Sequence, residues 1–202
     1  MKNTSKKKRW PIIAAVVLLI MVLVVPLVRC GSDDPGVPTL TVETPQKLSA
    51  SDKAEFTLDV TISELGEAIY PAASFSIRFD SSRLEFLGVE EGNVFVLDDR
   101  NQFGRQLPEW SVNVQNSNDT GLINIMYLDM TGGRYAFSRE LLAEEDNVVF
   151  RLNFRLRGSV RAGDVLDLIV EDAVFAASDE SQSLAMTTGT LKTKDSKIVI
   201  GE

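Results

Sequence analysis

The sequence predicts an all-β fold, a nine-stranded sandwich that begins near Thr39 and is preceded by one transmembrane helix. Three observations predict the sandwich. Stretches in which hydrophobic and polar residues alternate recur along residues 39–202, turn-rich stretches separate them, and helical periodicity is nearly absent. Alternation with a period of two is typical of strands that bury one face. Many short strands of this kind are typical of a β-sandwich or a jelly roll.

The alternation is clearest in residues 54–63, where hydrophobic side chains alternate with charged and hydroxyl-bearing ones. Turns rich in Gly, Asn and Asp are expected at residues 88–92, 116–121, 131–133 and 158–164. A short helix is expected over residues 138–145, with Ser138 as its N-cap. The nine expected strands are residues 39–44, 54–63, 73–79, 84–89, 110–114, 122–129, 148–157, 165–175 and 191–200.

The N-terminal part of the chain predicts a membrane anchor. Residues 11–28 carry no charge, and as a helix they extend about 27 Å, close to a hydrocarbon core of about 30 Å. Basic residues at positions 6–9 precede this run, so the positive-inside rule places residues 1–9 in the cytoplasm and residues 10–29 in the membrane. Residues 30–38 are expected to be a linker, and residues 39–202 one extracellular domain.

Two other fates of this segment remain open. The first is cleavage as a secretory signal, against which stand the length of the apolar run and the lack of an A-x-A site. The second is lipidation at Cys30, for which Leu27 is a suitable residue and Arg29 is not.

Charge and residue usage exclude several classes of function. The chain has a net charge of −8, and residues 1–30 contribute six basic and no acidic side chains, so the remainder carries −14. An acidic domain argues against a nucleic-acid partner, because phosphate binding needs a basic face. One cysteine and no histidine exclude a disulfide framework within the domain, the usual structural zinc sites and a histidine-based triad.

Chemistry by carboxylates alone is compatible with this composition. A pair among Asp80, Glu85 and Asp129 could act in glycoside hydrolysis, but acids at the turns and edges of an acidic sandwich are usually solvated charges. The oxygen-rich residues 33–34 and 98–101 do not match the spacing of an EF-hand loop. We therefore expect no enzymatic activity, no cofactor and no metal site.

Two aromatic residues allow two interpretations. Trp110 and Tyr127 are each in phase with the hydrophobic residues of their own expected strand, which favours a place in the core. The alternative is a flat surface on which a sugar ring stacks.

Three arginines, Arg151, Arg155 and Arg157, share one face of an expected strand. They either balance acids of a neighbouring strand or belong to a docking face.

Several stretches of the sequence resemble the cohesin family, and they occur in the family's order. The resemblance covers most of residues 40–200. It implies a nine-stranded sandwich with jelly-roll topology that binds dockerins, which are small calcium-binding modules carried by polysaccharide-degrading enzymes, and so assembles cellulosomes. The stretches are FSIRFDSSRLEF at residues 75–86, GVEEG at 88–92, INIMYLDMTG at 123–132, NVVFRLNFRL at 147–156, AGD at 162–164 and DAVFA at 172–176.

The resemblance also indicates where a partner binds. Family members present polar residues at the start of the strand that here begins with Ala72; Ser74 keeps a hydrogen-bonding side chain, whereas Ala72 departs from the pattern. Asp129 keeps an acidic position before a Thr-Gly turn. Met126 is out of phase with the hydrophobic face of its strand, so we expect it to be exposed. Ser74, Met126 and Asp129 are the predicted partner-binding residues.

The expected function is therefore that of a non-enzymatic cell-surface module that recruits a dockerin-type protein to the membrane. Two alternatives remain. One is a carbohydrate-binding module that attaches the cell to a polysaccharide, and the other is a structural envelope protein with homotypic contacts.

Overall fold

The computed structural model describes residues 36–45, 47–51, 55–94, 110–130, 132–133, 135–142 and 147–202. Val37–Glu202 form one compact unit. None of the helices in these ranges combines the length and the hydrophobicity that a bilayer crossing requires. The expected cytoplasmic tail and membrane span, and the linker up to residue 35, lie outside the ranges that the structure describes.

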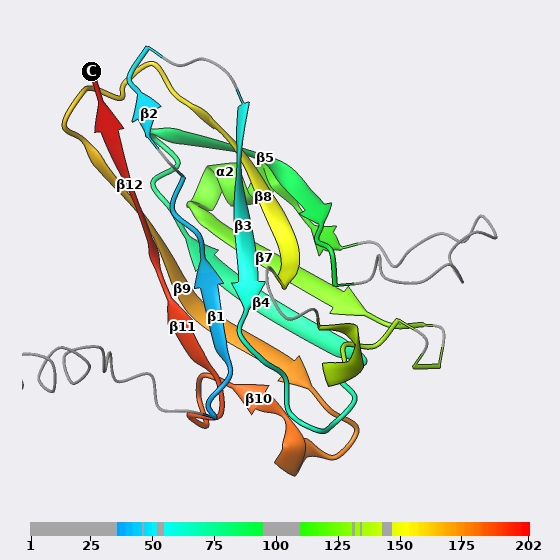
Figure 1. The fold of residues 1–202 in the computed structure, drawn as a ribbon. Helices are drawn as coiled ribbons and strands as arrows, with labels where there is room; N and C mark the ends of the chain where they lie inside the picture. The colour runs from blue at the N-terminus through cyan, green and yellow to red at the C-terminus, as the bar shows by residue number, and fades with distance from the viewer. Residues whose placement is uncertain are drawn as a thin grey trace, which may run out of the picture. The chain divides into compact units, whose positions relative to one another are not determined.

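The compact unit consists of two β-sheets packed face to face (Figure 1), with β3 and β8 in front of β4 and β7 in that view. The five-stranded sheet has the order β11-β1-β3-β8-β5, and the seven-stranded sheet has the order β2-β12-β9-β4-β7-β6, with β10 paired to β9. The strands are β1 (Thr39–Val42), β2 (Leu48–Ser49), β3 (Glu55–Ile62), β4 (Ala72–Arg78), β5 (Leu84–Glu91), β6 (Ser111–Val112), β7 (Leu122–Leu128), β8 (Val148–Leu156), β9 (Val165–Ala176), β10 (Leu184–Ala185), β11 (Lys192–Lys194) and β12 (Ser196–Gly201).

The predicted all-β sandwich is confirmed, and each of the nine expected strands is present. The described chain has twelve strands because residues 191–200 divide into β11 and β12, and because β2 and β10 are additional. These two strands have two residues each, too few to produce an alternating pattern. The jelly-roll topology that the resemblance implies stays a prediction.

Three local predictions are wrong. Residues 116–121 lie mostly in the helix α2 (Val114–Thr120) rather than in a turn, because the Asn113 side chain accepts a hydrogen bond from the Asn116 N–H and Gly121 ends the helix in the left-handed region. The expected turn at residues 88–92 is largely strand, since β5 continues past an irregularity between Phe86 and Gly88.

The third error concerns the N-cap of the short helix expected over residues 138–145. The described residues 138–142 contain one 3-10 turn, η3 (Arg139–Leu141), in which Ser138 makes no side-chain capping bond, and residues 143–145 lie outside the described ranges. A second 3-10 turn, η4 (Glu180–Gln182), follows β9.

The core lies between the two sheets and is rich in aromatic rings. Phe75 on β4 lies 5.0 Å from Phe150 on β8 and 5.4 Å from Phe175 on β9, measured between ring centroids. These contacts join the inner faces of both sheets. Rings that meet at an angle at such distances add to the hydrophobic gain. The other largest fully buried side chains are Tyr70, Tyr127, Phe86, Phe137, Phe154, Leu40, Leu58, Ile77 and Leu84.

One edge of the sandwich is closed by strands that pass from one sheet to the other. β11 pairs in parallel with β1 in the five-stranded sheet, and β12, which follows directly, pairs with β9 in the seven-stranded sheet. Between them, the Asp195 carboxylate accepts a hydrogen bond from the Val170 N–H at 2.9 Å. β1 and β2 make the same change of sheet, because β2 pairs with β12. These segments therefore connect the two sheets along this edge.

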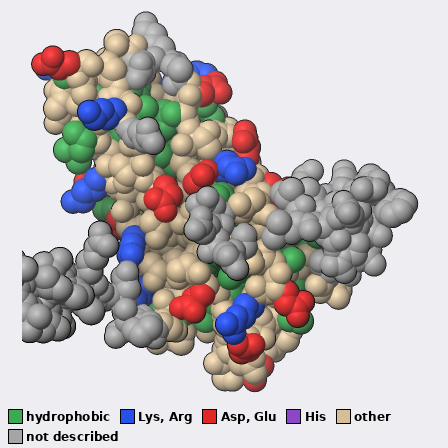
Figure 2. Space-filling view, viewed as in Figure 1, with side chains coloured by type: hydrophobic (Ala, Val, Ile, Leu, Met, Phe, Trp, Pro, Cys, Tyr) green, Lys and Arg blue, Asp and Glu red, His purple; other side chains and the backbone are tan. Residues whose placement is uncertain are grey.

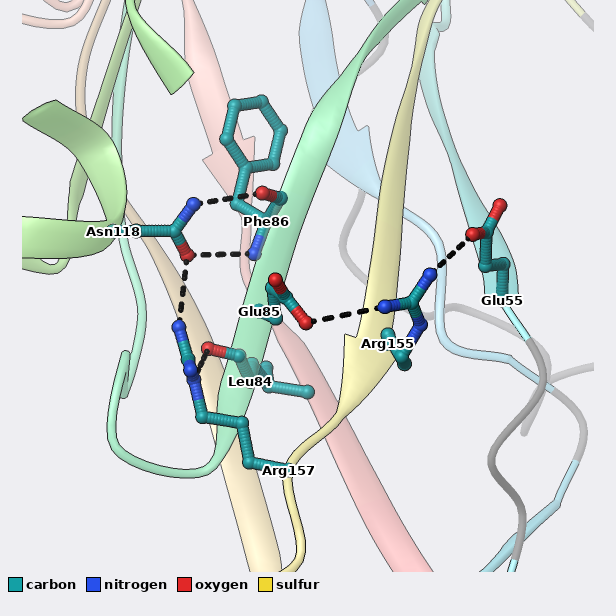
Figure 3. A network of polar contacts seen from close by, with 7 residues as sticks. All are labelled: Glu55, Leu84, Glu85, Phe86, Asn118, Arg155 and Arg157. Atoms are coloured by element: carbon teal, nitrogen blue, oxygen red, sulfur yellow. Dashed lines mark hydrogen bonds and ion pairs between the residues drawn. The ribbon is translucent and has the colours of Figure 1, made fainter. Parts of the chain in front are cut away.

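The opposite edge is closed by α2, whose Asn118 side chain takes the place of a neighbouring strand (Figure 3). The Asn118 Oδ1 accepts from the Phe86 N–H at 2.9 Å, and its Nδ2 donates to the Phe86 carbonyl at 2.8 Å. Arg157 extends the network, since its Nε donates to the Leu84 carbonyl at 3.2 Å and its Nη2 to the Asn118 Oδ1 at 3.5 Å. The outer edge of β5 is thus satisfied at Phe86.

We expect Asn118→Ala to destabilise residues 37–202 by about 2 kcal/mol, because it leaves a partly buried N–H and carbonyl of β5 without partners. Urea unfolding monitored by tryptophan fluorescence measures the change. The matched control is Asn116→Ala on the same helix, whose exposed side chain makes no hydrogen bond to any residue in the described ranges. Equal stabilities of the two variants would contradict the bridging role of Asn118.

Candidate protein-binding face

The outer face of the five-stranded sheet is charged, and its charges pair with one another. The Arg151 Nε lies 3.0 Å from the Asp59 Oδ1. Arg155 bridges two strands, with Nη2 2.6 Å from the Glu55 Oε1 and Nη1 3.5 Å from the Glu85 Oε2 (Figure 3). Figure 2, which views this side, shows acidic and basic side chains interspersed rather than gathered by sign. Of the two interpretations left open for the three arginines, balance by acids of neighbouring strands holds for Arg151 and Arg155, whereas Arg157 bonds to the Leu84 carbonyl and the Asn118 side chain.

A hollow of about 540 Å³ lies on this face. Its charged groups are also engaged, since Asp59 pairs with Arg151, the Glu90 carboxylate accepts from Asn153, and the Glu43 carboxylate accepts from Thr61. The face therefore offers few unsatisfied groups to a partner. The hollow is lined by Glu43, Thr44, Pro45, Thr57, Leu58, Asp59, Glu90 and Arg151.

The outer face of the seven-stranded sheet is different, because the exposed large hydrophobic side chains of the described residues lie on it or in the segments next to it. Those on the sheet are Met126 and Leu128 of β7, Val165 and Ile169 of β9, and Val199 of β12; Ile69 and Met130 lie in the adjoining segments. Met126 and Leu128 lie near one end of the sheet, and Val165 and Val199 stand opposite each other near the other end.

The centre of this face brings two of the predicted residues together. Ser74 on β4 stands directly opposite Met126 on β7, and on its other side it stands opposite Val174 on β9. Met126 in turn stands opposite Ser111 on β6. Met126 is 59% exposed, as its phase in the strand predicted. Contact of Ser74 and Met126 with a partner stays a prediction.

Asp129 has an internal role in the structure. Only 8% of its surface is exposed. Its N–H donates to the Pro71 carbonyl at 2.7 Å, and its Oδ2 accepts from the Gly133 N–H at 2.7 Å. The carboxylate thus organises the turn that follows β7. The prediction that it also contacts a partner remains a prediction.

The two aromatic residues considered for sugar stacking belong to the core, as their phase predicted. Tyr127 is 1% exposed, and its hydroxyl donates to the Tyr135 carbonyl. The Trp110 ring is partly buried and lies 4.9 Å from the Tyr127 ring and 5.1 Å from the Phe150 ring. Neither ring forms an exposed platform for a sugar.

The remaining acids that the sequence singled out take part in local structure. The Asp80 carboxylate accepts from the Ser82 N–H at 3.0 Å and pairs with Arg83, and Glu85 pairs with Arg155. Within the part of the chain that the structure describes, no three His, Cys, Asp or Glu side chains are placed to hold a metal ion. The oxygen-rich residues 33–34 and 98–101 lie outside that part.

The sequence did not reveal the inward orientation of Glu91. In the register of β5 and β8, Glu91 stands opposite the buried Phe150, so its side chain points toward the interior. Its Oε1 is buried and, among the described residues, has no hydrogen-bond partner; the same holds for the Trp110 Nε1. Burial raises the pKa of the Glu91 carboxyl above its usual 4.5. The irregularity near Gly88 produces this orientation. Two consecutive glutamates in the sequence do not predict that one of them points inward.

The fold defines the class of protein: a two-sheet β-sandwich with one charge-paired outer face and one outer face that carries exposed hydrophobic side chains among polar ones. The family model of the cohesin domain matches residues 39–194, and the protein therefore belongs to the cohesin domain family. No curated protein matches the sequence.

Solved structures share the fold at low sequence identity. One is the sixth cohesin of scaffoldin B from Acetivibrio cellulolyticus in complex with a Cel5 dockerin, with a TM-score of 0.57 and 16% identity over 81% of this chain and 99% of that one. The OlpA cohesin–Doc918 complex from Clostridium thermocellum gives 0.56 and 17% over 81% and 99%. A cohesin module of a Clostridium perfringens family 33 glycoside hydrolase gives 0.56 and 11% over 83% and 98%.

We expect Glu91→Gln to flatten the pH dependence of stability of residues 37–202. Because the pKa of Glu91 is raised by folding, the folded state keeps this proton to a higher pH than the unfolded state does. Its contribution is therefore fully present below a pH of about 4.5 and is lost as the pH rises through the raised pKa. A neutral glutamine has no such loss, so the variant should gain stability relative to the wild type as the pH rises.

Urea unfolding at intervals from about pH 4 to about pH 8 tests this. Glu90→Gln is the matched control, because the neighbouring Glu90 side chain is exposed and hydrogen-bonded to Asn153. A stability difference between Glu91→Gln and the wild type that stays constant with pH would show that Glu91 is not an abnormal acid.

Proposed function

We propose that the chain is a non-enzymatic binding module that holds a dockerin-type protein at the cell surface, with the outer face of the seven-stranded sheet as the docking surface. The observation that carries the proposal is the exposed hydrophobic centre of this face around Met126 and Leu128. Family membership supports it, as do the fold relatives solved in complex with dockerins.

The composition of the face suits a protein partner. A stable interface needs a hydrophobic centre with hydrogen-bonding groups around it. Met126 and Leu128 supply the centre, and Ser74 and Ser111 flank Met126 on the neighbouring strands. Pairing on both sides fixes the backbone of β7 beneath these side chains, so less backbone entropy is lost on binding. The opposite face has already paired its charges, so it has less to gain from a partner.

The place of action in this proposal is the outside of the cell membrane. It rests on the uncharged run at residues 11–28 and the basic residues before it, which favour a single span with the C-terminal domain outside. The resemblance implies that the partner is attached to a polysaccharide-degrading enzyme and that the calcium belongs to the partner. The module would then keep such an enzyme close to the cell.

We expect Met126→Asp to weaken the binding of a dockerin about 30-fold or more, since a hot spot contributes about 2 kcal/mol. The matched control is Val199→Asp, because Val199 is 60% exposed on the same sheet but lies on β12, away from the centre. Biolayer interferometry of the full chain against a panel of dockerins with calcium measures both. Absence of binding to every dockerin, or an equal loss in both variants, would refute the proposal.

The orientation in the membrane has its own test. Gly158→Cys in a Cys30→Ser background places one thiol in an exposed turn with open space around it. We expect a membrane-impermeant maleimide to label this thiol in intact cells. Labelling that requires lysis would place the domain inside the cell.

A further inference from the structure

β9 contains an irregularity at the centre of the seven-stranded sheet. In its pairing with β4, Ser76 stands opposite Asp172 and Ile77 stands opposite Val170, so Glu171 is an extra residue on β9. Before this point the odd-numbered residues of β9 face outward, and after it the even-numbered ones do. A bulge of this kind re-aims the side chains of a strand. As a result, the consecutive acids Glu171 and Asp172 both lie on the outer face.

The two acids differ in their partners. Glu171 forms a two-pronged ion pair with Arg78 of β4, in which the Nη2–Oε2 distance is 2.9 Å. Asp172 makes no hydrogen bond or ion pair with any described residue. The hydroxyl of Ser76, which stands opposite Asp172 on β4, donates to the Asn124 Oδ1 at 2.8 Å. Asp172 is therefore a partly buried carboxylate to which none of the described side chains is paired.

A partner that covers the face must compensate this charge. Asp172 is two residues from Val174, and Val174 belongs to the same row as Ser74 and Met126. Burial of an unpaired carboxylate under a partner costs free energy. A partner with a cation against the carboxylate avoids this cost and is therefore favoured over a partner without one. We propose, resting on the proposed function, that Asp172 selects partners that carry a lysine or arginine beside their hydrophobic anchor.

The distance between Asp172 and Val174 determines how far apart the basic and the hydrophobic residue of the partner must lie. Two residues along a strand span about 7 Å, and side chains three or four positions apart on a helix are separated by about 5–6 Å. A partner helix laid along the strands places its basic residue within one turn of the hydrophobic residue that contacts Met126 and Val174.

A displayed library tests this without knowledge of the natural partner. The probe is the Cel5 dockerin that is solved with the sixth cohesin of Acetivibrio cellulolyticus scaffoldin B, with its exposed helix positions randomised. It is selected with calcium on the full chain in mild detergent. Parallel selections use the wild type, Asp172→Asn, Asp172→Glu and Asp167→Asn. Asp167 is the matched control, because it is an exposed acid on the same strand outside the centre of the face.

We expect binders of the wild type and of the Asp172→Glu and Asp167→Asn variants to be enriched in lysine or arginine within one turn of a hydrophobic residue. Selection on Asp172→Asn should lose this enrichment. A binder selected on the wild type should bind Asp172→Asn about tenfold more weakly and with a shallower dependence on salt. Thermal unfolding of each variant confirms that it is folded, and Asp172→Ser is the second neutral variant.

Two results would contradict the inference in distinguishable ways. Binders that lose affinity on Met126→Asp but show no basic enrichment, or the same enrichment on Asp172→Asn, overturn the role of Asp172 and leave the proposed function standing. A library that yields no binder of the wild type overturns the proposed function, and this inference with it.

Discussion

The constraint on which the structure depends is the burial of one face of each sheet against the other. Every long strand contributes alternate side chains to a shared core, in which Phe75, Phe150 and Phe175 connect the two sheets. The side chains between them point to the outer face of each sheet and do not pack in the core. This separation explains how two sheets of one domain carry such different outer faces, one of paired charges and one of exposed hydrophobic groups. Changes on the outer faces need not disturb the core.

A sandwich also has to manage its edges, since an open edge strand can pair with another chain. This domain closes its two edges by different means. On one side β11 and β12 form a nearly continuous segment that belongs first to one sheet and then to the other. On the other side a seven-residue helix places one amide, that of Asn118, where a neighbouring strand would lie. Both devices hold an outer strand in place by contacts within the domain.

The strands of both sheets could be predicted from the sequence, because alternation over seven or more residues, as in β3 and β8, indicates a strand with one buried face. The sequence was insufficient where the period breaks. α2 depends on a capping side chain at Asn113 and on the left-handed Gly121, and carries no hydrophobic periodicity. The irregularities at Gly88 and Glu171 shift the phase of a strand, and they determine where Glu91 and Asp172 point. Ser74 and Met126 could be found from phase and resemblance, but the burial of Asp129 depends on the turn to Gly133.

The self-paired charges of the five-stranded sheet limit how many partners one domain can hold. Arg151 and Arg155 already have acidic neighbours within the same domain, so a second ligand on that side would have to displace bonds already made. In the proposed function, each copy of this domain therefore holds one partner at a time, and the complex has a one-to-one stoichiometry.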